Sequence, residues 1–145
     1  MDVEHKIFTV SGLEEINQVV AYLQKAMAGE ERLVLLYGDL GAGKTTLVKK
    51  LVERMGSADE TSSPTYGLVN EYEVLGGIFY HIDLYRIGDT EEALDMGIEH
   101  YIDRGAYCCV EWPQVIEPLV DTHIRVEITL QEDGSRLFAI DKMMG

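Results

Sequence analysis

The first third of the chain combines a strand pattern with a helix pattern. Residues 6–10 are compatible with a short strand, and Ser11 followed by Glu14 fits a capping box at the start of a helix. Gly29 is expected to end this helix, and the aliphatic segment 32–37 predicts a buried strand. Apolar residues recur at helical spacing between these points, which predicts one buried helix face formed by Leu13, Ile16, Val20, Leu23 and Met27.

The middle of the chain predicts a second helix, a loop and a hairpin. Residues from about 44 to 55 carry apolar side chains on one face, and Gly56 provides a stop signal. Segment 57–65 is rich in serine, threonine and acidic residues and contains a proline, which is typical of a loop. A hairpin is expected next, with its first strand, its turn and its second strand at residues 66–74, 75–77 and 78–84.

The last third continues to alternate helices with strands. Thr90 begins a helix pattern that is expected to end at Gly97, with a further helical turn to about residue 103. The remaining strand patterns lie at residues 106–110, 123–130 and 137–140. This alternation predicts an α/β fold with a central mixed sheet flanked by helices. Because 145 residues is a usual length for one domain, we expect residues 1–145 to form a single domain.

Candidate chemistry lies in a glycine-rich segment that satisfies Gly-x-x-x-x-Gly-Lys-Ser/Thr between a predicted strand and a predicted helix. Glycines permit backbone angles that let consecutive amide groups converge on phosphate oxygens. Lys44 would place a positive charge near the terminal phosphates, and Thr45 would offer its hydroxyl to Mg²⁺. In this context the segment predicts that the α/β fold is of the P-loop NTPase kind. It also predicts a site for a nucleoside triphosphate with Mg²⁺, formed by Gly38, Asp39, Leu40, Gly41, Ala42, Gly43, Lys44, Thr45 and Thr46.

Phosphoryl transfer that depends on Mg²⁺ also needs an acidic residue at the end of a neighbouring strand. Two residues meet this description, because Asp83 follows one apolar strand pattern and Glu111 follows another at 106–110. Either carboxylate alone is also compatible with a solvated strand end. Their occurrence beside the glycine-rich segment favours a functional role.

Charge narrows the class of partner. The chain carries 26 acidic and 12 basic residues, which gives a formal net charge of −14. Such a surface repels phosphate backbones, so unaided binding to nucleic acid is disfavoured and a basic protein partner is favoured. An acidic surface that only keeps the protein soluble fits the same numbers.

The N-terminus and the cysteines indicate the cellular compartment. No secretory signal pattern is present, and the longest aliphatic run, residues 33–36, is too short to span a bilayer. We therefore expect a cytoplasmic protein that does not enter a membrane. Cys108 and Cys109 are adjacent in a strand pattern, where side chains alternate between faces, so a disulfide between them would be strained. They are expected to be buried thiols.

Four segments resemble the bacterial TsaE family in their order and spacing, namely residues 38–46, Ser63-Pro64-Thr65-Tyr66, His-Ile-Asp-Leu-Tyr-Arg at 81–86, and Glu111-Trp112-Pro113. The resemblance covers nearly the whole chain. It implies a Mg²⁺-dependent ATPase, weak in isolation, of the pathway that makes threonylcarbamoyladenosine at position 37 of tRNAs reading codons that begin with A. It also implies partnership with the TsaB–TsaD complex, through which tRNA would be reached indirectly.

The resemblance further implies roles for individual residues. Lys44 would bind phosphate, and Thr45 and Glu111 would hold Mg²⁺. Asp83 would lie near the γ-phosphate and orient or activate the attacking water. Thr65 would belong to a switch-like loop that senses the γ-phosphate. The expected catalytic residues are therefore Lys44, Thr65 and Asp83.

For further contacts of the nucleotide, the sequence leaves alternatives. Trp112 would lie beside the nucleotide, and a purely packing aromatic is an equally good interpretation. Arg86 would stabilise charge, or form a simple surface ion pair. Contacts of the base are expected from Thr9, Ser11 or Arg136.

Three functions fit these residues. An ATPase subunit of a tRNA-modification assembly is favoured because all four segments agree on it. A small-molecule P-loop phosphotransferase and a nucleotide sensor that does not hydrolyse its ligand are the alternatives. The sequence has no Asn-Lys-x-Asp segment for guanine recognition and no arginine-rich lid, which disfavours a GTPase and a small-molecule kinase.

Overall fold

The computed structural model describes residues 5–39, 41–57 and 68–144. Within these residues one seven-stranded sheet forms the centre of the molecule. Its strands are β1 Lys6–Val10, β2 Leu33–Tyr37, β3 Val69–Val74, β4 Gly77–Asp83, β5 Tyr107–Glu111, β6 His123–Leu130 and β7 Arg136–Met143. The helices are α1 Leu13–Met27, α2 Lys44–Arg54, α3 Thr90–Asp95, α4 Ile98–Ile102 and the 3-10 helix η1 Pro113–Leu119.

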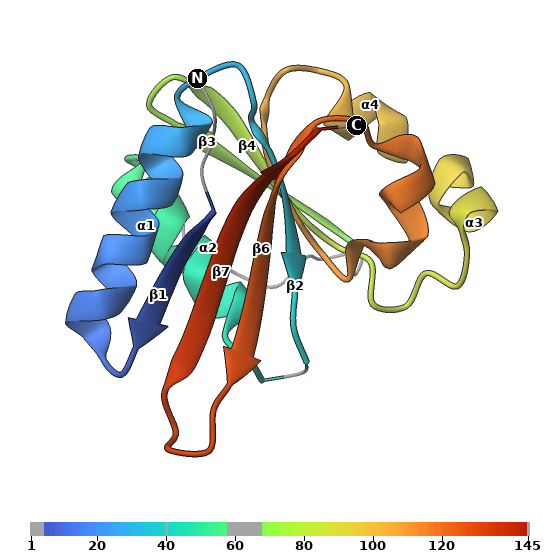
Figure 1. Ribbon diagram of the computed structural model, residues 1–145. Coiled ribbons are helices and arrows are strands. Elements are labelled where there is room, and N and C mark those ends of the chain that lie inside the picture. Colours follow the sequence, from blue (N-terminus) through green and yellow to red (C-terminus); the bar gives the residue numbers. More distant parts are fainter. Residues whose placement is uncertain (1–4, 40, 58–67, 145) are drawn as a thin grey trace.

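The sheet is parallel at its centre and antiparallel at both sides. The strand order is β1-β7-β6-β2-β5-β4-β3. Strand β2 pairs in parallel with β5 and β6, and β4 pairs in parallel with β5. The β3–β4 and β6–β7 hairpins and the β1–β7 pair are antiparallel. Helices lie on both faces of this sheet (Figure 1), which confirms the predicted mixed sheet flanked by helices.

Two clusters of buried side chains hold the helices on the sheet, and β2 contributes to both. Val34 and Leu36 belong to the cluster shared with α1 and α2. Leu33 and Leu35 belong to the cluster on the opposite face, which also contains side chains of α3, α4 and η1. All four aliphatic residues are buried. A strand covered on both faces needs apolar side chains at every position, which explains the uninterrupted aliphatic run.

The predicted helices and strands are confirmed in the described residues, but two local details differ. Helix α1 has Gly12 as its N-cap and no side-chain cap, and the carboxylate of Glu15 accepts a hydrogen bond of 3.1 Å from the backbone N–H of Ser11. The expected capping box with Glu14 is therefore wrong. Helix η1 was not predicted, although Pro113 in its first turn is a common start signal. Of the predicted loop 57–65, only Ser57 is described.

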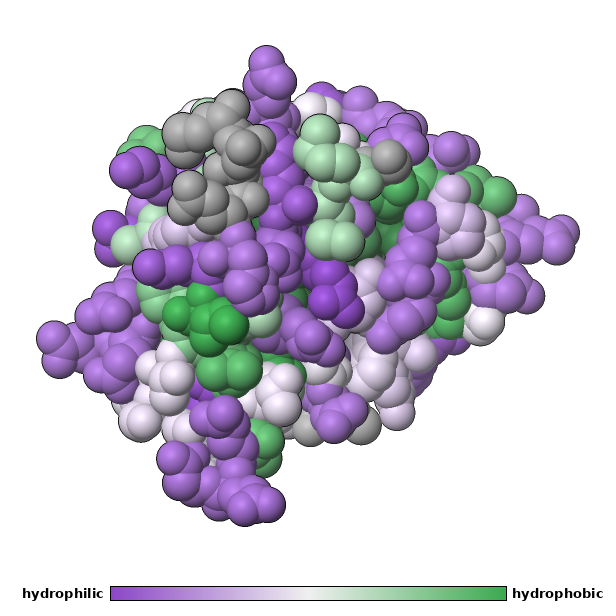
Figure 2. Space-filling model, in the orientation of Figure 1, coloured by the Kyte–Doolittle hydropathy of each residue, from purple (hydrophilic) through white to green (hydrophobic). Residues whose placement is uncertain are grey.

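The visible face of the molecule is largely hydrophilic (Figure 2). Hydrophilic side chains cover most of the face in Figure 2, and apolar side chains gather only in small patches between them. None of the helices in the described part of the chain combines the length and apolar character that crossing a membrane requires.

The two adjacent cysteines provide a test of whether β5 is buried on both of its faces. Cys108 and Cys109 are buried free thiols, and they belong to opposite clusters. Burial raises the pKa of Cys108 to about 12 and raises the pKa of Cys109 well above its usual value. Because the thiolate is the reactive form, neither thiol should react with Ellman's reagent at mildly alkaline pH until denaturant is added. Labelling of either cysteine in the folded protein would contradict this arrangement.

Candidate functional site

The carboxyl ends of three parallel strands meet at one edge of the sheet. Leu36 of β2 and Asp83 of β4 are both register partners of Glu111 at the end of β5. Beyond Leu36, β2 leads through the glycine-rich segment into α2. Parallel strands place their carboxyl ends together, and such edges are where α/β sheets bind ligands. Two acids that are 28 positions apart in the chain are therefore neighbours in space.

Glycines shape the turn between β2 and α2. Gly38 has φ 153°, and a Cβ atom there would lie 2.9 Å from the carbonyl oxygen of Ile128. Gly43 is the N-cap of α2 and has a left-handed conformation with φ 111°. Both positions thus disfavour a side chain. The N-terminal amides of α2 begin directly after this turn, which gives the edge of the sheet a positive pole.

Lys44 is a buried cation at the start of α2. Its side chain is only 4% exposed, and Nζ donates a hydrogen bond of 2.5 Å to the carbonyl of Gly38. The same Nζ lies 3.5 Å from the ring centroid of Trp112. Burial lowers the pKa of Lys44, and the nearby carboxylates of Glu111 and Asp83 act in the opposite direction. The ammonium group therefore lies among acidic groups and is largely shielded from water.

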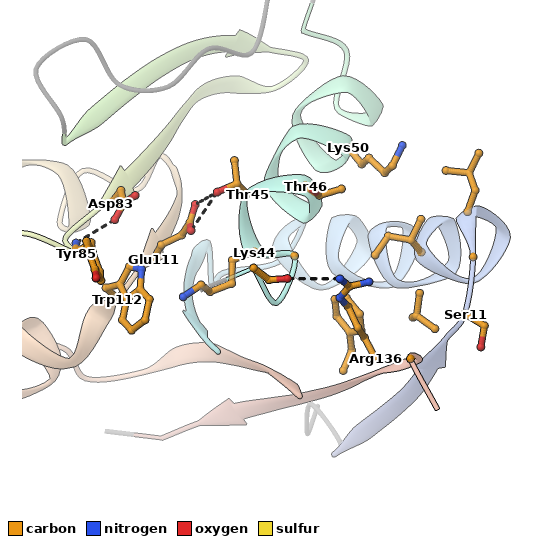
Figure 3. A pocket seen from close by; sticks show the side chains of 18 residues that line it. Ser11, Lys44, Thr45, Thr46, Lys50, Asp83, Tyr85, Glu111, Trp112 and Arg136 are labelled. Atoms are coloured by element: carbon orange, nitrogen blue, oxygen red, sulfur yellow. Dashed lines mark hydrogen bonds between the residues drawn. The ribbon is translucent and has the colours of Figure 1, made fainter. Parts of the chain in front are cut away.

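Glu111 is a buried carboxylate that touches α2. Its side chain is 4% exposed. The hydroxyl of Thr45 donates to it, with Oγ1 lying 2.9 Å from Oε2 and 3.2 Å from Oε1. The ring Nε2 of His81 lies 2.5 Å from Oε2. The two residues expected to hold a metal ion, Thr45 and Glu111, are thus in direct contact (Figure 3).

Asp83 and two aromatic residues complete this side of the site. The carboxylate of Asp83 accepts a hydrogen bond of 3.0 Å from the backbone N–H of Tyr85 through Oδ1. The rings of Tyr85 and Trp112 lie 5.0 Å apart between centroids. Trp112 has a left-handed backbone with φ 55°, which is uncommon for a bulky residue. The indole of Trp112 lies against the ammonium group of Lys44.

A pocket of about 580 Å³ opens at this edge of the sheet. Its volume is within the roughly 300–1,000 Å³ typical of sites for small ligands. Asp83, Tyr85 and Trp112 lie on one side of it, and Ser11 and Arg136 lie on the other, with the start of α2 between them (Figure 3). The apolar residues that line the pocket belong to the β1–α1 segment and to β7, which also carry Ser11 and Arg136; they are Val10, Leu13, Ile16 and Phe138. The side of the pocket formed by these segments is therefore largely apolar apart from Arg136.

Arg136 bridges the apolar side to the glycine-rich turn. Its Nη2 donates to the carbonyl oxygen of Gly41 across 3.4 Å. Its Nε is buried and has no hydrogen-bond partner among the described residues. A buried donor without a partner is costly, so this nitrogen is available to an acceptor that enters the pocket.

Most of the predicted site residues lie together. Those that line the pocket are Ser11, Gly41, Gly43, Lys44, Thr45, Thr46, Asp83, Glu111, Trp112 and Arg136. Gly38, Asp39 and Ala42 belong to the same turn without lining the pocket, and neither Thr9 nor Arg86 lines it. Leu40 and Thr65 lie outside the described residues.

Several pocket residues were not predicted. Tyr85 follows Asp83 by two positions in the same segment, so its position near the site could have been predicted from the sequence. Lys50 follows Thr46 by four positions on α2, which places both on one helix face. The contact between His81 and Glu111 had no signal in the spacing, because it depends on the pairing of β4 with β5.

The residues at this edge can supply oxygen ligands to a Mg²⁺ ion. No group of three or more His, Cys, Asp or Glu side chains that could hold a metal ion occurs within residues 5–39, 41–57 and 68–144. Mg²⁺ in phosphate-binding sites usually takes one or two protein oxygens and completes its shell with phosphate and water. The hydroxyl of Thr45 and the carboxylate of Glu111 supply that number.

Known proteins similar to this chain point to one family. The family model described as threonylcarbamoyl adenosine biosynthesis protein TsaE matches residues 10–138. Several relatives carry the name tRNA threonylcarbamoyladenosine biosynthesis protein TsaE. The one from Haemophilus influenzae is 40% identical over 106 residues, which cover 72% of this chain and 67% of the relative. The one from Bacillus subtilis is 35% identical over 120 residues, which cover 83% and 74%.

A solved structure agrees with these relatives. The crystal structure of YdiB from Bacillus subtilis superposes with a TM-score of 0.74 at 28% sequence identity. The match covers 98% of this chain and 87% of YdiB. Since the family model spans most of the chain and relatives above 30% identity match it over most of their length, the chain belongs to the TsaE family.

Proposed function

We propose that this protein is the Mg²⁺-dependent ATP-binding and ATP-hydrolysing subunit for threonylcarbamoyladenosine modification of tRNA at position 37, acting with the TsaB–TsaD complex. The modification pathway follows from membership of the TsaE family. The main support for ATP chemistry is the buried Lys44, which lies within one pocket with Thr45, Glu111 and Asp83.

Different residues are proposed to act in nucleotide binding and in hydrolysis. Lys44 and the N-terminal amides of α2 would bind the phosphates. Thr45 and Glu111 would hold Mg²⁺, which when bound supplies positive charge against the oxygens of the γ-phosphate. Asp83 would orient the attacking water, because it lines the pocket and its Oδ1 is held by the backbone N–H of Tyr85. Thr65 keeps its proposed role as a sensor of the γ-phosphate.

The apolar side of the pocket suits the adenosine. A base would lie against the apolar side chains there, and the unpartnered Nε of Arg136 would find an acceptor on the ligand. Ser11 lines the same side.

Exposure at the charged side supports dependence on a partner. Tyr85 is 54% exposed, and Thr45 and Thr46 are also exposed. Water that reaches the reacting phosphate weakens electrostatic stabilisation, so turnover in isolation should be slow. A partner that covers this side would complete the site, and tRNA would be reached through that partner.

The first test concerns Lys44. Replacement Lys44→Ala should weaken binding of Mg²⁺ with a non-hydrolysable ATP analogue by about 1.5–3 kcal/mol, or roughly 10- to 150-fold in Kd. Titration calorimetry measures this change. Lys49→Ala is a matched control, because Lys49 belongs to the same helix and is exposed. Equal affinity of the two variants would remove the support for phosphate binding at Lys44.

The second test separates the two acids. Glu111→Gln should raise the Mg²⁺ concentration needed for half-maximal phosphate release, because a ligand of the ion is lost. Asp83→Asn should lower kcat by about 10²–10⁴-fold while nucleotide affinity survives. Steady-state phosphate release and calorimetry distinguish the two effects. The assignment is wrong if Asp83→Asn alone alters the dependence on Mg²⁺.

The third test concerns the partner. Phosphate release by the wild type should rise at least about tenfold when purified TsaB–TsaD is added, since the partner excludes water from the site. Lys44→Ala mixed with the same partner provides the background rate. Label transferred from the γ-phosphate to a metabolite would favour a phosphotransferase. The absence of phosphate release under every condition would favour a nucleotide sensor.

A further inference from the structure

His81 is a buried polar residue that the proposed chemistry does not use. It lies on β4, two positions before Asp83, and it is not among the residues that line the pocket. Its side chain is 6% exposed, and its Nε2 lies 2.5 Å from Oε2 of Glu111. A buried imidazole and a buried carboxylate at this distance share one hydrogen bond that water does not compete for.

The direction of this hydrogen bond follows from the acceptor. An ionised carboxylate only accepts, so Nε2 of His81 carries the proton and donates it to Glu111. Thr45 approaches the same carboxylate from α2, closer to Oε2 at 2.9 Å than to Oε1 at 3.2 Å. Glu111 is therefore fixed from two elements, and Oε1 carries the weaker of its contacts.

We propose that His81 is a positioning residue that holds the Glu111 carboxylate in the orientation needed to bind Mg²⁺ together with the nucleotide. This inference rests on the proposed function. Glutamate has three rotatable side-chain bonds, so a carboxylate held only by Thr45 would turn away more easily. Residues that hydrogen-bond a metal ligand from behind typically contribute 10- to 100-fold to metal affinity, which sets the size of the expected effect.

A histidine that served packing alone would behave differently. Its replacement would weaken folding and would reduce nucleotide affinity to the same degree with and without Mg²⁺. A positioning residue acts through the ion, so its replacement should affect only the part of the affinity that depends on Mg²⁺. The ratio of the two affinities therefore separates the roles.

Variants of His81 test the hydrogen bond itself. His81→Phe keeps an aromatic ring without a donor. His81→Gln places an amide N–H close to the position of Nε2, whereas the shorter side chain of His81→Asn does not reach it. Tyr80→Phe is the matched control, because Tyr80 is buried on the same strand and its hydroxyl accepts from Arg104, in the cluster on the other face.

The measurement is calorimetric titration of each full-length variant with a non-hydrolysable ATP analogue, once with Mg²⁺ and once with EDTA, alongside thermal melting. We expect His81→Phe and His81→Asn to lose roughly 10- to 100-fold in affinity with Mg²⁺ and to match the wild type in EDTA. His81→Gln should recover most of the loss, and Tyr80→Phe should match the wild type in both conditions.

The outcomes that overturn the inference are distinct from failure of the proposed function. Equal affinity of asparagine and glutamine variants with Mg²⁺ would overturn it, as would equal losses with and without Mg²⁺. The asparagine and glutamine pair decides the question even if the phenylalanine variant does not fold, because the two differ by one methylene group. A wild type that binds no nucleotide would refute the proposed function and this inference with it.

Discussion

Parallel pairing of β2, β5 and β4 is the constraint on which the site depends. In parallel strands the carboxyl ends lie at one edge, so the turn after β2 and the final acids of β4 and β5 meet there. A change of one residue in register would send Glu111 to the other face and separate it from α2. The buried aliphatic residues on both faces of β2 oppose such a change, because each would move into the wrong cluster.

Charge balance at that edge follows from burial. Lys44 and Glu111 are each nearly inaccessible to water, and a buried charge without partners is strongly unfavourable. Lys44 is compensated by a carbonyl, an aromatic face and nearby carboxylates, and Glu111 by a hydroxyl and an imidazole. A polyphosphate would add several negative charges here, which explains why the proposed ligand would need a divalent cation in addition to the lysine.

Much of this site could be predicted from the sequence, because the patterns that identify it lie within short segments of the chain. The glycine-rich segment could be recognised from spacing, and Asp83 and Glu111 could be placed at strand ends because apolar runs precede them. The strand order was not predictable, since a hydrophobic pattern predicts a strand but not which other strand pairs with it. The hydrogen bond from His81 to Glu111 depends on that order, so it emerges only from the three-dimensional arrangement. Arg136 was named from the sequence as a candidate contact of the base, but its hydrogen bond to the carbonyl of Gly41 was not predictable.

Trp112 illustrates how backbone strain can serve such a site. Its left-handed backbone is followed by Pro113, and the residue before a proline usually prefers an extended conformation. Such a conformation costs roughly 1–3 kcal/mol and persists only where the surroundings impose it. It sets the indole against the ammonium group of Lys44. A cation on an aromatic face gains only about 0.5–2 kcal/mol, so under the proposed function phosphate oxygens with their full charge would displace the ring. Trp112 would then hold Lys44 near the pocket until the proposed ligand binds.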